Sequence, residues 1–134
     1  MEQSKLEADL EQVRRYSEEL YGGPLDYFER LARYRPEVLV DWMKLRKDIY
    51  EPQDKSGLDF RHMELVSTAI EIVARKPNPD RHAVRAIEAG ATVREVADVV
   101  SLCIMLGGMM TYIVSGQHAL KAAEDRAREL GRLD

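Results

Sequence analysis

The chain has almost no cysteine: Cys103 stands alone among 134 residues. A single cysteine excludes an intramolecular disulfide and a cysteine-rich metal site. The compartment is therefore not constrained by disulfides, and we expect the reducing cytosol as the default. Residues 1–20 are strongly charged and contain no apolar stretch of the kind that forms a signal peptide. We therefore expect no secretory leader.

A basic stripe is also missing. The formal net charge is -4 and aromatic residues make up only 7% of the chain. The basic pairs Arg14-Arg15 and Arg46-Lys47 both lie among acidic residues, as on a solvated helix surface. This pattern argues against binding to nucleic acid, because a phosphate backbone needs clustered positive charge.

The familiar catalytic motifs are absent as well. The sequence has no glycine-rich phosphate loop, no Cys-x-x-Cys, no nucleophile elbow around a serine and no His-Glu-x-x-His. Candidate chemistry is therefore confined to three histidines and to acids near apolar helices. The three histidines and Glu64 contain no pair at the i, i+3 or i+4 spacing of helical metal ligands, so we predict no metal site.

What the sequence has is helical periodicity along its whole length. Apolar residues recur every three to four positions, and no alternating strand pattern occurs. We predict an all-α, single-domain bundle of six to seven helices covering residues 1–134, with a loop at 51–57. The expected helices are 4–21, 24–34, 36–49, 58–75, 78–90, 92–106 and a last one, after Gly107-Gly108, to about residue 130.

Local signals set several of these helix ends. Asn78 and Pro79 suit an N-cap followed by a first-turn proline, and Gly90 suits a helix end with positive φ. Thr92 and Glu95 have the spacing of a capping box.

One uncharged segment, residues 99–116, could be read in two ways. Its eighteen residues reach the lower limit for a membrane span. However, Gly107-Gly108 invites a break at its centre, and no aromatic belt flanks it. A helix that is apolar all round is usually buried in a core or at an oligomer interface. We therefore expect no membrane insertion.

The segment 58–100 contains Leu58-Asp59, Glu64-Leu65, His82, Ala89-Gly90, Thr92 and Glu95. This pattern resembles the core of the carboxymuconolactone decarboxylase family, which includes the alkylhydroperoxidase D-like proteins. The similarity extends over about residues 36–120, and we expect residues 1–23 to form an N-terminal helix outside it. The resemblance implies an all-α subunit with a central antiparallel helix hairpin and no cofactor. It also implies an obligate homo-oligomer, a trimer or a trimer of dimers, which would cover the uncharged segment.

The sequence departs from the family in two places. The peroxidase branch has Cys-x-x-Cys where this chain has Arg75 and Asn78. A dithiol cycle needs an attacking and a resolving thiol, so peroxidase activity is disfavoured. The decarboxylase branch commonly has Tyr-x-Gly-x-Pro where residues 106–110 keep only the glycine. This difference leaves the shape of the substrate pocket open.

The resemblance assigns catalysis to His82 and Glu64. Near neutral pH an imidazole can take up or return a proton, which suits decarboxylation or isomerisation. Glu64 would orient His82 or restore its proton, and Arg81 could hold a substrate carboxylate. From the residues alone, His82 can equally be a packing residue of a first turn. Glu64 can equally be an acid placed near a helix start.

The other two histidines have weaker assignments. His118 is a candidate for substrate binding, although a core or interface position suits it as well. His62 is expected to be exposed on a different helix face from Glu64. Cys103 and the neighbouring methionines are typical of an apolar core.

The resemblance thus implies a cofactor-free enzyme of the carboxymuconolactone decarboxylase type. Its substrate would be a small carboxylated compound, cyclic or unsaturated and lactone-like. The alternative is a non-catalytic helical oligomer that binds an apolar ligand or a protein partner.

Overall fold

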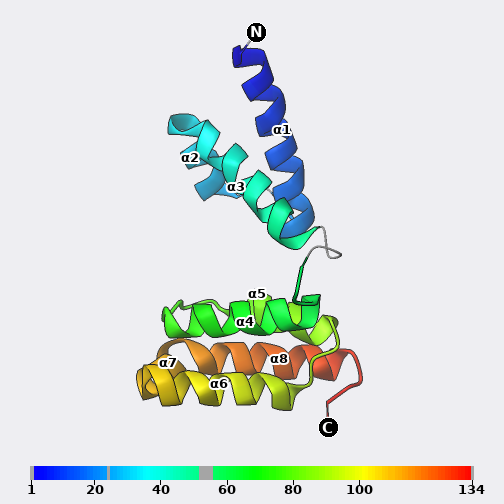
Figure 1. The fold of residues 1–134 in the computed structure, drawn as a ribbon, viewed down its shortest axis with the longest axis vertical. Helices are drawn as coiled ribbons and strands as arrows, with labels where there is room; N and C mark the ends of the chain where they lie inside the picture. Colours follow the sequence, from blue (N-terminus) through cyan, green and yellow to red (C-terminus); the bar gives the residue numbers. More distant parts are fainter. Residues whose placement is uncertain (1, 24, 52–55, 134) are drawn as a thin grey trace. The chain divides into compact units, whose positions relative to one another are not determined.

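The computed structural model describes residues 2–23, 25–51 and 56–133, and it confirms the all-α prediction for these ranges. The ribbon is shown in Figure 1. The predicted loop at 51–57 falls largely on residues 52–55, which lie outside the described residues. The helices are α1 (Glu2–Tyr21), α2 (Asp26–Tyr34), α3 (Pro36–Tyr50), α4 (Phe60–Val73), α5 (Asp80–Glu88), α6 (Val93–Gly107), α7 (Met109–Thr111), the π-helix η2 (Tyr112–Gly116) and α8 (Gln117–Glu129).

The helix ends follow most of the local signals. Gly90 has φ 103°, as a glycine at a helix end allows. Two details of the prediction are wrong. The N-cap of α5 is Pro79 rather than Asn78, so the helix begins one residue later. Only half of the capping box forms: the Glu95 amide donates to Thr92 Oγ1, whereas the Glu95 carboxylate accepts from Arg61 at 2.6 Å.

The chain divides into two compact units, residues 1–55 and residues 56–134. In the N-terminal unit, α1 and α2 both pack against α3. Its buried residues are large, and half-buried aromatic rings surround them. The ring of Trp42 lies 5.0 Å from Phe28 and 6.0 Å from Tyr16 between centroids. The buried core of this unit is Val13, Tyr16, Leu39, Val40 and Met43.

In the C-terminal unit, four helices form a closed ring of contacts. Helix α4 packs against α5 and α6, and α8 packs against the same two helices (Figure 1). The core contains many small residues, which let the helix axes approach closely. Its buried members are Ile72, Ala83, Ile87, Val96, Val100, Cys103, Ala119, Ala123 and Ala127.

The uncharged segment is broken at its centre, as the glycine pair predicts. Gly108 has φ 90°, a conformation that favours glycine, and it separates α6 from α7. The chain then continues through a π-helical turn, which the periodicity did not predict. Gly116 ends this turn, and a Cβ there would lie 3.3 Å from Val100. In the part of the chain that the structure describes, no helix has the length and apolarity to cross a membrane.

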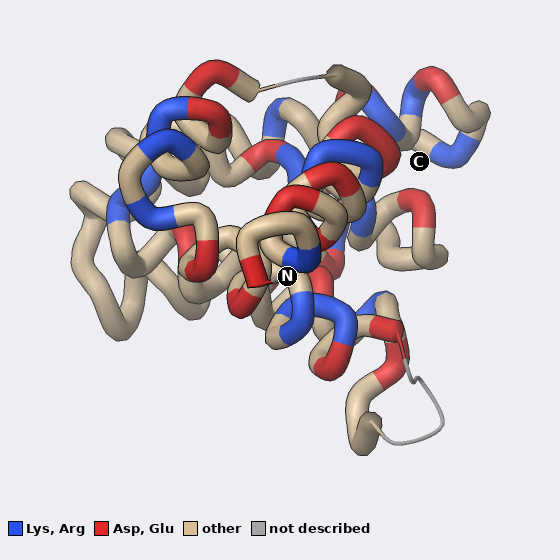
Figure 2. The backbone as a smooth tube through the Cα atoms, turned by 90° about the horizontal axis from the view of Figure 1, so that it is seen from above, with Lys and Arg blue, Asp and Glu red and all other residues tan. Residues whose placement is uncertain are grey.

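Acidic and basic residues are interspersed along the helices (Figure 2). The segment from 99 to 116 adds none of either sign. Much of it is nevertheless exposed, and exposed apolar side chains also lie on α4. Together they are Val66, Ile70 and Val73 of α4, with Leu102, Met105, Leu106, Met109, Met110 and Ile113 of the uncharged segment. We call these nine residues the apolar face.

Candidate active site

Glu64 is a buried carboxylate on α4. Only 5% of its side chain is exposed, although it lies in a helix that begins at Phe60. The start of this helix is capped separately by Asp59, whose carboxylate accepts the His62 amide at 2.9 Å. That hydrogen bond and a second one from the His62 ring lower the pKa of Asp59. Because Asp59 serves the helix end, Glu64 is not needed there and is available for another partner.

His82 is that partner. It lies in the first turn of α5, and its Nδ1 is 2.6 Å from Glu64 Oε2. The contact joins two helices that are adjacent in the ring of four, and the imidazole is only 20% exposed. A separation of 2.6 Å is that of a short, charge-assisted hydrogen bond. The structure therefore brings together the two residues that the sequence assigned to catalysis.

Glu71 is a further member of the site, which the sequence analysis missed. Its Oε1 lies 3.3 Å from His82 Nε2, so both ring nitrogens face carboxylates. Glu71 follows Glu64 by seven residues, which places both side chains on one face of α4, two turns apart. This i, i+7 spacing of acids within an apolar helix was the signal available in the sequence.

Lys76 completes the cluster from the turn that follows α4. Its Nζ lies 3.8 Å from Glu71 Oε1. The turn is a Schellman motif, in which the amide of Lys76 donates to the Glu71 carbonyl and that of Arg75 to the Ile72 carbonyl. Arg75 takes φ 57°, where glycine is more usual. This reversal returns the chain toward α4 and sets Lys76 beside Glu71.

The cluster runs from the interior to the surface. The exposed fraction of the side chain rises from 5% at Glu64 to 20% at His82, and then from 19% at Glu71 to 60% at Lys76. The Nδ1 contact with Glu64 is a hydrogen bond, which needs a proton between nitrogen and oxygen. The arrangement can therefore orient the imidazole through Nδ1 while its Nε2 edge faces the more exposed end of the cluster.

The remaining candidates are exposed side chains. Arg81 is exposed, one position before His82 on α5. His118 is exposed in the first turn of α8, so it is not a core residue. His62 is exposed, as expected, and pairs with Asp59. Among the described residues, no group of three His, Cys, Asp or Glu side chains is arranged to hold a metal ion.

Cys103 is buried in α6, where its Sγ lies 3.7 Å from the Ala69 carbonyl oxygen. Burial raises the pKa of its thiol, and a thiol kept protonated is a poor nucleophile. The residues at the positions of the family's redox pair, Arg75 and Asn78, carry no sulfur. Cys103 therefore has no second thiol in this sequence with which to form a dithiol pair.

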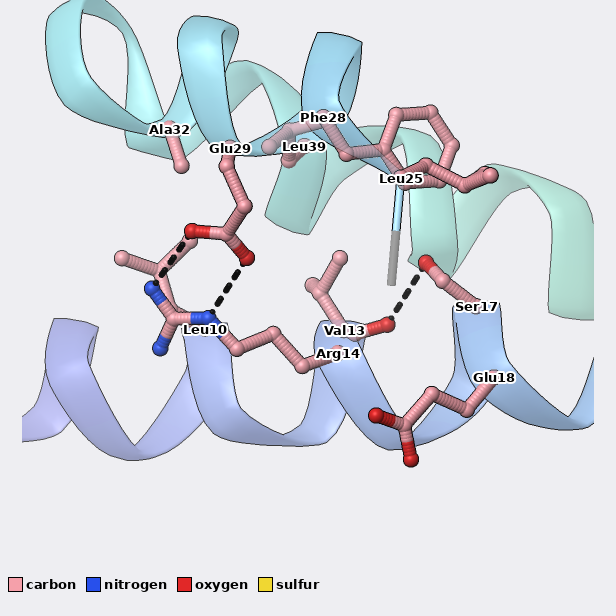
Figure 3. Close-up of a pocket in the computed structure, with 10 residues that line it drawn as sticks. All are labelled: Leu10, Val13, Arg14, Ser17, Glu18, Leu25, Phe28, Glu29, Ala32 and Leu39. Atoms are coloured by element: carbon pink, nitrogen blue, oxygen red, sulfur yellow. Dashed lines mark hydrogen bonds and ion pairs between the residues drawn. The ribbon is translucent and has the colours of Figure 1, made fainter. Parts of the chain in front are cut away.

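A small pocket lies in the N-terminal unit, between α1 and the helices α2 and α3 (Figure 3). Leu10, Val13 and Phe28 line it, and Arg14 and Glu29 pair beside it. Its volume of about 50 Å³ accommodates a few water molecules but not a ring-sized substrate. The pocket is therefore too small for a sizeable apolar ligand of the kind that the alternative function would bind.

The sequence model that describes the carboxymuconolactone decarboxylase family matches residues 36–125, which include Glu64, Glu71 and His82. The structure is similar to a crystal structure from Burkholderia xenovorans LB400 that is provisionally named a carboxymuconolactone decarboxylase. The TM-score is 0.78 at 23% identity, over 94% of this chain and 96% of that one, a likeness that shows the fold alone. No curated protein matches the chain. The extent of the family match shows that the chain belongs to the carboxymuconolactone decarboxylase family.

Proposed function

We propose that the protein is a cofactor-free, lyase-type enzyme that decarboxylates a small carboxylated, lactone-like substrate. The observation that carries this proposal is the 2.6 Å contact between buried Glu64 and His82. Membership of the carboxymuconolactone decarboxylase family supports the same type of chemistry.

The proposed mechanism moves one proton. When carbon dioxide leaves, the electron pair of the broken C–C bond remains on the substrate, and a conjugated carbonyl takes the charge as an enolate. His82 then donates its Nε2 proton to carbon, and solvent restores that proton. Glu64 keeps the ring oriented through Nδ1 and stabilises the protonated imidazole, as a buried carboxylate does for a catalytic histidine. We also propose that Arg81 and His118, both exposed, contact the substrate as it enters.

The test is turnover of a carboxymuconolactone by the wild type and by His82→Ala. We expect the variant to lose about 100-fold or more in kcat, because positioned proton transfer contributes that much. His62→Ala is the matched control, since His62 is exposed and pairs with Asp59 rather than Glu64. Unchanged turnover in His82→Ala would contradict the mechanism.

We further propose that the subunits associate with copies of themselves through the apolar face. Nine exposed apolar side chains on elements that pack against one another favour an interface between subunits. Its members lie on α4, α6, α7 and η2, so one surface could serve a closed homo-oligomer. Analytical ultracentrifugation of Met105→Lys should then show a smaller species than the wild type. A wild-type protein that sediments as a monomer would exclude this assembly.

The same face is what supports the alternative function, a non-catalytic oligomer that binds a protein partner. This alternative requires no proton transfer at His82. A wild-type protein that is correctly folded and assembled but turns over no carboxylated lactone would favour it.

A further inference from the structure

Glu71 lies between two nitrogen atoms that can hold an anion. The same oxygen, Oε1, is 3.3 Å from His82 Nε2 and 3.8 Å from Lys76 Nζ. A carboxylate is the group that matches this pair, because it can accept from both donors at once. The protein itself therefore fills a carboxylate position next to its candidate proton donor.

This position is the accessible side of His82. The Nδ1 edge meets Glu64, whose side chain is 5% exposed, and the Nε2 edge meets Glu71, whose side chain is 19% exposed. Lys76 beyond it is 60% exposed. The Glu71 side of His82 is therefore the less buried one, and a carboxylate that approached Nε2 there would take the place of Glu71.

The two carboxylates hold His82 unequally. The contact with Glu64 is 2.6 Å, whereas that with Glu71 is 3.3 Å, beyond the usual N–H···O range. The ion pair of Glu71 with Lys76 is long and partly exposed, and solvent screening makes such pairs weak. Glu71 is therefore the carboxylate that can leave, while Glu64 stays.

We propose that Glu71 is an internal substitute for a carboxylate ligand, and that a small external carboxylate binds between His82 Nε2 and Lys76 Nζ when Glu71 turns away. In a decarboxylase this would place the carboxylate end of the substrate beside the proton donor. That last role rests on the proposed function, but the binding position does not. No bond is made or broken in the exchange.

Acetate is a suitable probe because it carries the same carboxylate group as Glu71 but is not attached to the protein chain. In the wild type, acetate must compete with a carboxylate whose effective concentration is in the millimolar range or above. In Glu71→Ala the position is vacant, and acetate can enter without competition. We expect acetate to bind Glu71→Ala at least tenfold more tightly than the wild type.

The measurement is an NMR titration that follows the ring nitrogens of His82. In Glu71→Ala, acetate should shift the Nε2 signal to saturation and leave the contact of Nδ1 with Glu64 in place. Glu71→Gln is the matched control for shape, because its amide still fills the position and should prevent the tenfold gain. Glu95→Ala is the control for charge, since it releases Arg61 elsewhere and should not make His82 respond to acetate.

Two further arms make the result specific. Acetamide, which is neutral but of similar shape, should not reproduce the acetate shift. Adding Lys76→Gln to Glu71→Ala should weaken acetate binding again, because one of the two donors is lost. Glu71→Ser opens the same position and replaces Glu71→Ala if the alanine variant does not fold.

Equal acetate affinity in the wild type and in a folded Glu71→Ala or Glu71→Ser variant would overturn the proposal, as would saturation with no response at His82 Nε2. The experiment needs no turnover, so it is independent of the proposed reaction. Acetate binding in Glu71→Ala together with full activity in His82→Ala would retain the carboxylate position and reject the mechanism.

Discussion

The two units of the chain achieve a helical core in different ways. The N-terminal unit packs large side chains, with Trp42 in ring contact with Tyr16 and Phe28. The core of the C-terminal unit includes fully buried alanines on α5 and α8, among them Ala83, Ala119 and Ala123. Large rings fill the space between helices that lie far apart, whereas alanines require the helices to approach closely.

The difference matters for the site. Helix α5 is held against both α4 and α8, and its alanines leave little room for movement. A side-chain contact as short as that of Glu64 with His82 needs the two helices at a fixed separation. The tightly packed unit is therefore the one suited to hold a charged pair in its interior. Four substitutions test this contrast between the units.

The largest effect is expected from Ala123→Leu. Ala123 is completely buried in α8, and three added carbon atoms would force the close-packed helices apart. Overpacking of this kind should lower the free energy of unfolding by about 2–3 kcal/mol. Urea denaturation measures the loss, with Ala8→Leu at an exposed position of α1 as the control. A loss no larger than in the control would contradict the idea of a close-packed unit.

Trp42→Ala should have the next largest effect. The indole is half-buried and contacts two other rings, so its removal loses apolar burial and aromatic contacts in the N-terminal unit. We expect the unit to lose about 2 kcal/mol, below the 3–5 kcal/mol typical of a fully buried tryptophan. Hydrogen exchange of the α1 and α3 amides measures it. Trp42→Phe should recover part of the loss, and failure to do so would argue against packing as the cause.

Thr92→Ala removes the side-chain cap of α6. Its hydroxyl accepts the Glu95 amide at 3.1 Å, and the loss of such a cap costs about 1 kcal/mol. Thr92→Ser keeps the acceptor and should restore stability in urea denaturation. Equal losses in both variants would show that the hydroxyl contributes little.

The smallest effect is expected at the ion pair of Arg14 with Glu29, which joins α1 to α2 at 2.9 Å. Both side chains are exposed, and solvent screening limits the pair to less than about 1 kcal/mol. The Arg14 hydrogen bond lowers the pKa of Glu29 below its ordinary 4.5. The contribution is therefore present above that value and is lost as the pH falls through the lower folded value. Arg14→Gln should accordingly match the wild type in acid and be slightly less stable at neutral pH in thermal unfolding.

Much of the fold could be predicted from the sequence, because helix formation depends on local patterns. The apolar spacing and the glycines placed most helix ends within a few residues, and Gly108 breaks the uncharged segment as expected. The π-helical turn at 112–116 was not predictable, since it reflects how this segment packs against α4 and α6.

The candidate site shows the same division. Family resemblance pointed to His82 and Glu64, and the structure places them in contact. Glu71 was missed because an acid in a helix usually faces solvent, and its spacing from Glu64 says nothing about what lies opposite. Arg81 and His118 are exposed: adjacent residues on a helix do not face each other, so Arg81 points away from His82, and His118 lies on a different helix, α8.

By itself, the sequence determined the all-α class, the positions of most helices and the absence of a redox cysteine pair, because these depend on residue identity and short-range spacing. The tertiary structure alone decided that His82 meets two carboxylates, and that Glu64 is buried while Glu71 is partly exposed. The contacts of His82 depend on how α5 packs against α4, and the chain reaches α5 through the turn at Arg75. Packing and turn together bring side chains into contact that are separated along the chain.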